Sequence, residues 1–241
     1  MTHFHESFVK NTKNRKANSV NMKDKNDKYI SQAVIRRLPR YFRYLRELLN
    51  NDTMRISSKE LSEKMNITAS QIRQDLNCFG GFGQQGYGYN VKHLYNEISK
   101  ILGVDKRYTA IIVGVGNLGK ALINTPMFEK RGVQICGLFD VSSDTVGRRF
   151  GEFTVMHADT MPQFCKDNNV DIAILTLPKT KVYQTASILA ETGVKGFWNF
   201  SNTELKSDAF PGVMIENVHL GDSLMALCYS VNAGETLQDK K

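Results

Sequence analysis

A glycine-rich turn directly after an apolar run constrains the fold of this chain more than any other feature. Residues 109–113 are β-rich and largely apolar, and the pattern Gly114-Val115-Gly116-Asn117-Leu118-Gly119 follows at once. In such a turn the first glycine permits a tight bend, the second lets the backbone approach a pyrophosphate, and the third lets the next helix pack on the strand. That helix, expected from residue 120 to about 129, directs its free amides toward the phosphates. The pattern predicts a dinucleotide-binding βαβ unit; the alternative is a vestigial unit that holds another nucleotide.

The residue that ends the second predicted strand indicates which dinucleotide binds. This strand covers residues 133–139 and is followed by Asp140, 21 residues after Gly119. A carboxylate at this point can accept hydrogen bonds from the adenosine ribose and would repel a 2′-phosphate, which favours NAD over NADP. Arg148 and Arg149 lie a little farther on and keep NADP open as an alternative.

The rest of the C-terminal half alternates strands with helices. Strands are expected at 171–177, closed by Pro178, and then at 194–200 and 213–218, with a helix at 182–192. This alternation predicts an α/β fold with a Rossmann-like, doubly wound and mostly parallel sheet. A last helix, at roughly 220–232, has an apolar side that includes Leu220, Leu224, Leu227 and Val231. That helix either finishes the core or crosses to a second subunit.

The positive charge of the chain lies in its first 103 residues. The chain contains 32 Lys and Arg against 24 Asp and Glu, a formal net charge of +8. Residues 1–103 hold 18 of these cations against 9 anions, and residues 104–241 hold 14 against 15. A basic front half suggests an anionic polymer as the partner of that half. The alternative is a solvated surface with a floppy tail.

Residues 1–30 are predicted to be a disordered basic tail. Lys, Asn and Asp dominate this segment, and its apolar residues show no period. Met22 is a second plausible start of the chain, so the first 21 residues are expected to be dispensable.

Two short capped helices outline a helix-turn-helix after a first, arginine-flanked helix. Ser57 stands three residues before Glu60, and Thr68 stands three residues before Gln71. Each pair is predicted to form a capping box, in which the hydroxyl accepts from a first-turn amide and the Glu or Gln side chain reaches back. The two helices are expected at about 58–65 and 69–78.

The second short helix and the segment after it have the composition of a DNA-binding surface. The polar residues expected on its outer face, which can hydrogen-bond base edges or phosphates, are Ser70, Gln71, Arg73, Gln74 and Asn77. Residues 79–89 then mix glycines with aromatic residues, which suits a β-hairpin wing. These features predict a winged helix-turn-helix that binds double-stranded DNA and ends near Gly103. The alternative is a plain three-helix interaction module.

The sequence contains no recognisable catalytic, metal-binding or membrane-spanning pattern. His157 and His219, the histidines of the C-terminal half, sit in no acid/base motif, and the four cysteines form no CxxC pair. No apolar run approaches the roughly 18 residues of a membrane span, and no secretion signal is apparent. We therefore expect a cytoplasmic sensor without a metal, and not an enzyme.

Taken together, these motifs resemble the Rex family of redox-sensing transcriptional repressors from about Ile30 to about Val231. The resemblance rests on the joined motifs of both halves, which are Gln71-Ile72-Arg73-Gln74-Asp75-Leu76, Gly86-Tyr87-Gly88-Tyr89, the glycine turn, Ile174-Leu175-Thr176-Leu177-Pro178 and Gly193-Val194-Lys195-Gly196-Phe197-Trp198-Asn199-Phe200. It implies a homodimer that binds inverted-repeat operators and exchanges its C-terminal helices between subunits. It also implies that NADH releases the DNA, so that the protein senses the NADH/NAD+ ratio.

The chain departs from the family pattern at both of its implied sites. Gln74, Gln84 and Gln85 stand where the family usually places cations, which predicts weaker DNA binding that depends less steeply on salt. The family commonly has Tyr near the nicotinamide where this chain has Thr125. It also pairs an Asp across the dimer with an Arg of the first helix; Arg43 remains here, but the Asp position is His219. These departures suggest a divergent paralogue.

The sequence thus yields a definite set of domains, site residues and alternatives. The expected domains are a tail (1–30), a winged helix (31–103), a Rossmann NAD(H)-binding domain (104–218) and a C-terminal helix swapped in the dimer (219–235). Candidate cofactor-binding residues are Gly114, Val115, Gly116, Asn117, Leu118, Gly119, Asp140 and Pro178; candidate DNA-binding residues are Ser70, Gln71, Arg73, Gln74, Asn77, Gln84, Gln85 and Tyr87; candidate switch residues are Arg43, Thr125 and His219. The alternatives are an NAD-dependent oxidoreductase with a basic appendage and a CoA- or nucleotide-binding module, since the C-terminal half also resembles the CoA-binding domain of acyl-CoA ligases.

Overall fold

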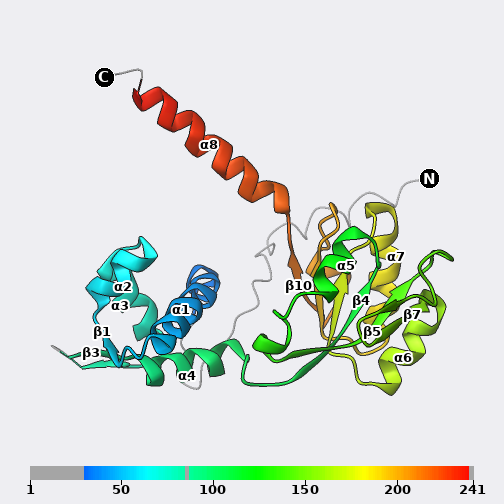
Figure 1. Ribbon diagram of the computed structural model, residues 1–241, viewed down its shortest axis with the longest axis horizontal. Coiled ribbons are helices and arrows are strands. Elements are labelled where there is room, and N and C mark those ends of the chain that lie inside the picture. The colour runs from blue at the N-terminus through cyan, green and yellow to red at the C-terminus, as the bar shows by residue number, and fades with distance from the viewer. Residues whose placement is uncertain (1–29, 85–86, 239–241) are drawn as a thin grey trace, which may run out of the picture. The chain divides into compact units, whose positions relative to one another are not determined.

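The computed structural model describes residues 30–84 and 87–238 (Figure 1). The chain divides after Gly103 into two compact units. The tail predicted for residues 1–29 and the predicted DNA contact Gln85 lie outside the described residues.

The N-terminal unit is a winged helix. Its elements in chain order are α1 (Gln32–Asn50), β1 (Arg55–Ile56), α2 (Ser58–Met65), α3 (Ala69–Asn77), β2 (Gly83–Gln84), β3 (Gly88–Asn90) and α4 (Val91–Leu102). The three short strands pair antiparallel in the order β1-β3-β2. The α1 stripe is buried at Leu38, Tyr41 and Leu45, and Phe42 stacks on Tyr95 of α4 with ring centroids 4.7 Å apart. The predicted helix-turn-helix and wing are therefore both present.

The capping residues begin the short helices as predicted, with one exception. Ser57 and Glu60 form a complete capping box at the start of α2. Thr68 accepts a hydrogen bond from the Gln71 backbone amide at the start of α3, but the Gln71 side chain does not return to it. That side chain donates instead to Asp75, so the second predicted box was wrong. The Gln71 amide nitrogen donates to the buried Asp75 carboxylate in a charge-assisted hydrogen bond, which is stronger than the bond that its amide oxygen would accept from the exposed Thr68 N–H.

The C-terminal unit is an α/β fold with a seven-stranded sheet in the order β10-β9-β8-β4-β5-β7-β6. Its elements are β4 (Tyr108–Val113), α5 (Asn117–Ile123), β5 (Val133–Asp140), β6 (Arg149–Phe150), β7 (Phe153–His157), α6 (Met161–Asp167), β8 (Ile172–Leu175), α7 (Lys179–Ala190), β9 (Gly196–Asn199), β10 (Met214–Asn217) and α8 (Leu220–Gln238). Only the edge pair β6–β7 is antiparallel among the described strand pairs of this sheet. The strand order reverses direction next to β4, as in a doubly wound sheet, and the predicted fold class is confirmed.

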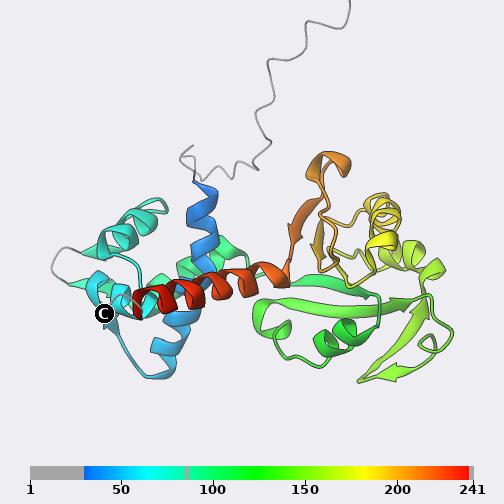
Figure 2. The same cartoon turned by 90° about the horizontal axis from the view of Figure 1, so that it is seen from above.

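The two faces of this sheet carry separate apolar cores, because successive residues of a strand point to opposite faces. On β4, Ile111 and Val113 belong to the core that includes residues of α6 and α7. Ala110 and Ile112 belong to the other core, which includes Leu122 of α5. Figure 2 shows α5 on one side of the sheet and α6 and α7 on the other.

Two parts of the C-terminal unit differ most from the sequence prediction. The helix expected at 120–129 is α5, which begins at Asn117 and ends at Ile123, and a 3₁₀ turn follows at Glu129–Arg131. Pro126 explains the early end, since the residue before a proline disfavours the helical conformation. The elements β6, β7 and α6 were not predicted. They occupy residues 149–167, a segment without a strong apolar period.

The last helix, α8, does not finish the core of its unit. Residues 220–232 are all exposed, and the large apolar side chains Leu224, Met225 and Leu227 are 60%, 64% and 58% exposed. Among the described residues, no helix is both long enough and apolar enough to span a membrane.

Candidate nucleotide site and DNA-binding face

The three glycines of the turn after β4 lie in different steric surroundings, which explain why glycine suits each position. Gly114 has a φ of +94°, and a Cβ there would lie 2.7 Å from the carbonyl oxygen of Thr176. A Cβ on Gly116 would meet no protein atom within 4 Å, so the backbone is open to a ligand at this point. A Cβ on Gly119 would overlap the carbonyl oxygen of Gly114, where α5 crosses close to the turn. The surroundings of Gly114 and Gly119 fit the predicted tight turn and close helix packing, and the approach of Gly116 to a pyrophosphate stays a prediction.

The start of α5 is open to an anion. Gly116 is the N-cap residue, in an extended conformation with φ −74° and ψ −164°, and no side chain accepts from the first amides. Those amides belong to Asn117 and Leu118, which follow the carboxyl end of β4. Uncapped amides at a helix start can bind a phosphate, so Asn117 and Leu118 lie where a pyrophosphate would be expected.

Asp140 ends β5 beside this turn and binds it directly. Its Oδ2 accepts a hydrogen bond of 2.6 Å from the Val115 amide, and its Oδ1 accepts from the amides of Val141 and Ser142 at 2.7 and 2.9 Å. The carboxylate therefore joins the glycine turn to the loop after β5. This supporting role was not predicted, and it fixes Asp140 at the edge where a ribose would lie.

Pro178 lies at the same edge of the sheet. It follows β8, the strand that pairs with β4 on the side opposite β5, and it is the N-cap residue of α7. Thr176, between them, donates its hydroxyl hydrogen to the Gly114 carbonyl oxygen. The glycine turn, Asp140 and Pro178 thus meet where the strand order reverses, the usual ligand crevice of such a sheet.

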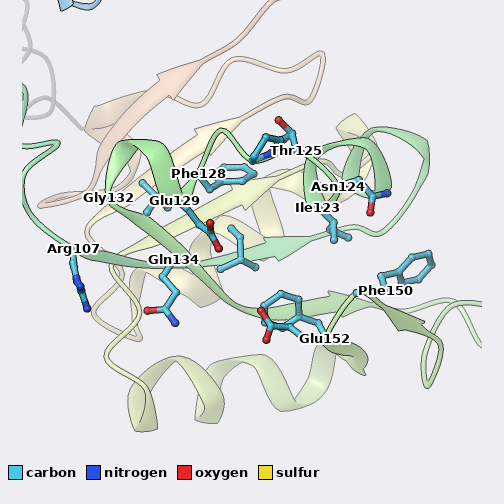
Figure 3. Close-up of a pocket in the computed structure, with 15 residues that line it drawn as sticks. Arg107, Ile123, Asn124, Thr125, Phe128, Glu129, Gly132, Gln134, Phe150 and Glu152 are labelled. Carbon is cyan, nitrogen blue, oxygen red and sulfur yellow. The ribbon is translucent and has the colours of Figure 1, made fainter. Parts of the chain in front are cut away.

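Thr125 lies elsewhere, in the turn after α5, on the wall of a cavity of about 530 Å³ (Figure 3). The lining also includes Phe128, Val133 and Ile135 as apolar residues and the exposed Gln134 as a polar one. This cavity is formed over the first half of β5 and includes neither the glycine turn nor Asp140. We do not take this cavity as the candidate dinucleotide site, because the glycine turn and the uncapped start of α5 lie at the opposite ends of β4 and β5.

Helix α3 exposes four of the five residues on it that were predicted to contact DNA, namely Ser70, Arg73, Gln74 and Asn77. Gln71 is half-buried, and its amide nitrogen donates to Asp75 Oδ1 over 2.8 Å. Arg73 Nη1 donates to the Ser58 hydroxyl at 3.0 Å, which holds this guanidinium at the start of α2. The structure therefore provides an exposed polar face but directs Gln71 inward.

Asp75 is a fully buried carboxylate that the sequence prediction missed. It accepts hydrogen bonds from Arg37 Nε and Nη2 at 2.6 and 2.7 Å, from the Tyr41 hydroxyl at 2.9 Å and from Gln71. Burial by itself would raise the pKa of this carboxyl, but the hydrogen bonds from Arg37, Gln71 and Tyr41 outweigh burial and lower the pKa. The group thus stays ionised, and it anchors α3 to α1.

Some of the basic residues of α1 are used inside the unit. Arg37 is bound to Asp75, and Arg40 Nη2 donates to the Met65 carbonyl oxygen at the end of α2. Arg43 is exposed, with its guanidinium carbon 5.5 Å from the centre of the Tyr44 ring. The charge of this segment is therefore only partly available to an anionic partner.

The remaining predicted residues lie on the wing and before α8. Tyr87 is 69% exposed, and Gln84 is the last described residue of β2. His219 is half-buried directly before α8, and its carbonyl oxygen accepts from the Asp222 amide at 3.1 Å.

The described residues form no recognisable metal site, and two of their cysteines are partly or fully buried thiols. The described part of the chain contains no group of three or more His, Cys, Asp or Glu residues that could hold a metal ion. Burial raises the pKa of the Cys165 thiol to about 11 and also raises that of Cys136, so both are protonated at neutral pH.

Comparisons with known proteins identify the two halves and then the whole. The family model "Putative DNA-binding protein N-terminus" matches residues 29–77, and the model "CoA binding domain" matches residues 105–203. The "Redox-sensing transcriptional repressor Rex" of Thermoanaerobacter sp. (strain X514) is 53% identical over 212 residues, which are 88% of this chain and 94% of the relative. The chain belongs to the Rex family of redox-sensing transcriptional repressors. Rex of Clostridioides difficile (strain 630) is 51% identical over 87% of this chain and 99% of its own length.

Solved Rex structures agree with this assignment over both units. The structure of "RSP, a Rex-family repressor" is 50% identical, with a TM-score of 0.81 over 88% of this chain and 98% of RSP. RSP in complex with β-NAD+ and operator DNA is 52% identical with a TM-score of 0.80, over 88% of this chain and 97% of that one. The resemblance inferred from the sequence is confirmed, and Rex membership places the chain among transcriptional repressors and not among enzymes.

Proposed function

We propose that this chain is a cytoplasmic, homodimeric repressor that binds inverted-repeat operator DNA and releases it when NADH binds. The observation that carries the proposal is the similarity over both units to RSP, which has been solved with β-NAD+ and operator DNA. The separate complex of RSP with β-NADH, at 50% identity, supports NADH as the effector.

The residues of the glycine turn fit a dinucleotide. Gly116 leaves open space that a pyrophosphate would fill, the helix that begins at Asn117 and Leu118 has no side-chain cap, and Asp140 ends β5 beside the turn, where it would meet the ribose. The bound nucleotide would contribute the oxidation state of its nicotinamide as the signal. The chain would contribute only a difference in affinity between its DNA-binding and released conformations, since a ligand shifts an equilibrium only through such a difference.

A homodimer would match the two halves of an inverted repeat. Two-fold symmetry places two copies of α3 one helical turn, or a multiple of it, apart on one side of the DNA. The exposed apolar residues of α8 support a second copy as the partner that covers this helix, because exposed apolar side chains of this number mark interaction sites.

Separate titrations of NADH and NAD+ test the redox-sensing proposal. The probe is a labelled inverted-repeat duplex, selected by the protein from a random pool, and its anisotropy reports binding. NADH is expected to weaken operator binding by roughly 5- to 150-fold, the usual range of such couplings, and NAD+ to do so far less. Equal release by both nucleotides, or by neither, would contradict redox sensing and leave DNA binding standing. CoA is titrated as a third ligand, because the family model "CoA binding domain" matches residues 105–203.

His219→Asp is expected to strengthen the NADH response. The proposed pair across the dimer needs a carboxylate opposite Arg43, and a histidine cannot supply one. NADH should then release the operator at a lower concentration than in the wild type, by about threefold or more, since a charged pair of this kind contributes on the order of 1 kcal/mol. His219→Asn is the uncharged control. Adding Arg43→Gln to His219→Asp should cancel the gain, and an unchanged NADH response in His219→Asp would show that position 219 does not carry the switch.

A further inference from the structure

The wing has no cation in its own sequence. Residues 79–90 contain no Lys or Arg, although this segment includes the β2–β3 hairpin. A hairpin that approaches DNA without a positive charge gains little from the phosphates, because phosphate contacts supply much of the affinity. Tyr87 exposes its aromatic ring on this segment.

Arg55 brings a guanidinium to this wing from the neighbouring strand. It is an exposed residue of β1, and its Nη1 donates to the Tyr87 carbonyl oxygen over 3.2 Å. Its guanidinium carbon lies 5.8 Å from the centre of the Tyr87 ring, within the range of a cation–π contact. Two contacts to one residue define where this flexible side chain lies.

The backbones of β1 and β3 lie close together next to Arg55 and Tyr87. β1 and β3 pair antiparallel, with Ile56 opposite Tyr89, and both of those side chains are buried. Gly88 has a φ of +68°, and a Cβ there would lie 2.6 Å from the Ile56 carbonyl oxygen. Only glycine therefore lets β3 come this near to β1, and that approach brings Tyr87 within reach of Arg55.

A second guanidinium lies at the other end of the same short segment. Arg73 of the recognition helix donates to the hydroxyl of Ser58, three residues after Arg55. The segment 55–58 thus has one cation bound to the wing and one belonging to α3. Two guanidinium groups along one short stretch of backbone suit neighbouring phosphates of a single DNA strand.

We propose that Arg55, held against Tyr87, is the phosphate-binding cation of the wing and takes the place of the basic residues that the wing itself lacks. This inference rests on the proposed DNA-binding function and adds a residue to it. Only one of the five N–H donors of Arg55 is used by the Tyr87 carbonyl oxygen. The remaining donors of a planar guanidinium match a phosphate with two parallel hydrogen bonds. Tyr87 acts as a positioning residue through its ring.

The salt dependence of DNA binding tests this role. Arg55→Gln is compared with the wild type on the selected operator and on a scrambled duplex between 50 and 200 mM salt. Loss of one phosphate contact should lower the slope of log affinity against log salt by about one and weaken binding to both duplexes equally, by about tenfold at low salt. Arg55→Lys should keep the slope, because it keeps the charge. Lys166→Gln, a charge removed from α6, is the matched control and should change neither quantity.

Variants of Tyr87 separate the ring from the hydroxyl. Tyr87→Phe keeps the ring and should bind DNA more tightly than Tyr87→Leu, which removes the ring and should lose part of what Arg55→Gln loses. Thermal melting of each variant verifies that the winged helix remains folded.

The possible outcomes distinguish this inference from the proposed function. An unchanged slope in folded Arg55→Gln overturns the inference, and so does a loss confined to the operator, which would indicate base reading. If NADH fails to release the wild type while Arg55→Gln lowers the slope, redox sensing fails and Arg55 keeps its role. If the wild type binds neither duplex, the DNA-binding function fails and the inference fails with it.

Discussion

Gly119→Ala is expected to shift the NADH response to roughly 100-fold higher NADH concentration while leaving operator binding intact. The added Cβ would overlap the Gly114 carbonyl oxygen and lie 3.2 Å from the Thr176 hydroxyl oxygen. Neither atom can move easily, since Gly114 is in the turn and Thr176 directly follows β8, the neighbour of β4. α5 must therefore shift away from the sheet and take the amides of Asn117 and Leu118 with it. Overpacking of this kind costs about 1–3 kcal/mol, and the misplaced amides should weaken NADH binding by roughly 100-fold.

Gly116→Ala is the matched control for this variant. Gly116 has a negative φ, and its added Cβ would meet no protein atom within 4 Å. The stability of the C-terminal unit should therefore stay within about 0.5 kcal/mol of the wild type, while NADH binding weakens because the methyl group occupies the space of the pyrophosphate. Calorimetric titration of NADH and thermal melting measure the two effects separately. Wild-type NADH affinity in Gly119→Ala would show that the turn does not hold the dinucleotide.

Asp75→Ala is expected to destabilise the N-terminal unit by about 3 kcal/mol, the usual cost of removing one partner of a buried ion pair. The substitution leaves Arg37, Tyr41 and Gln71 without their common acceptor, and Tyr41 is fully buried. Since domains of this size are stable by only about 5–10 kcal/mol, much of the stability would be lost. Urea unfolding followed by circular dichroism measures the change. Gln74→Ala, at the neighbouring exposed position, should stay within about 0.5 kcal/mol of the wild type.

The same carboxylate gives the unit a characteristic acid sensitivity. Its folded pKa lies below the ordinary value of 3.8, so its contribution to stability is fully present above pH 3.8. That contribution disappears as the pH falls from 3.8 through the lower folded pKa, because the unfolded chain then binds the proton more readily. Asp75→Asn should lack this part of the acid transition. An identical acid transition in Asp75→Asn and the wild type would rule out Asp75 as its source.

Local signals in the sequence were sufficient for much of the fold and of the nucleotide site. The Ser57–Glu60 box, the glycine turn and the strand that ends in Asp140 each depend on residues close together in the chain, and the structure places all three as predicted. The spacing of the glycines also predicts the steric need for glycine at positions 114 and 119.

Features that depend on distant partners could not be predicted in this way. Asp75 stands among polar residues of α3, and only the position of Arg37, 38 residues earlier, makes it a buried acceptor. Gln71 likewise has two possible partners, Thr68 and Asp75, and the tertiary structure decides between them. The cation that Arg55 brings to the wing is invisible in the wing's own sequence, because it arises from the pairing of β1 with β3.

The exposed apolar side chains of α8 also affect how long a single chain survives in the cell. A newly made single chain presents Leu220, Leu224, Leu227 and Val231 to water, together with Tyr229, which is 74% exposed. Quality-control proteases and chaperones act on such surfaces, so under the proposed pairing a single chain would be open to them until a second copy covered the helix. Synthesis of many chains at one place, as on one messenger RNA, would shorten that interval. The amount of working repressor should then rise more steeply than its rate of synthesis, since pairing depends on the product of two chain concentrations.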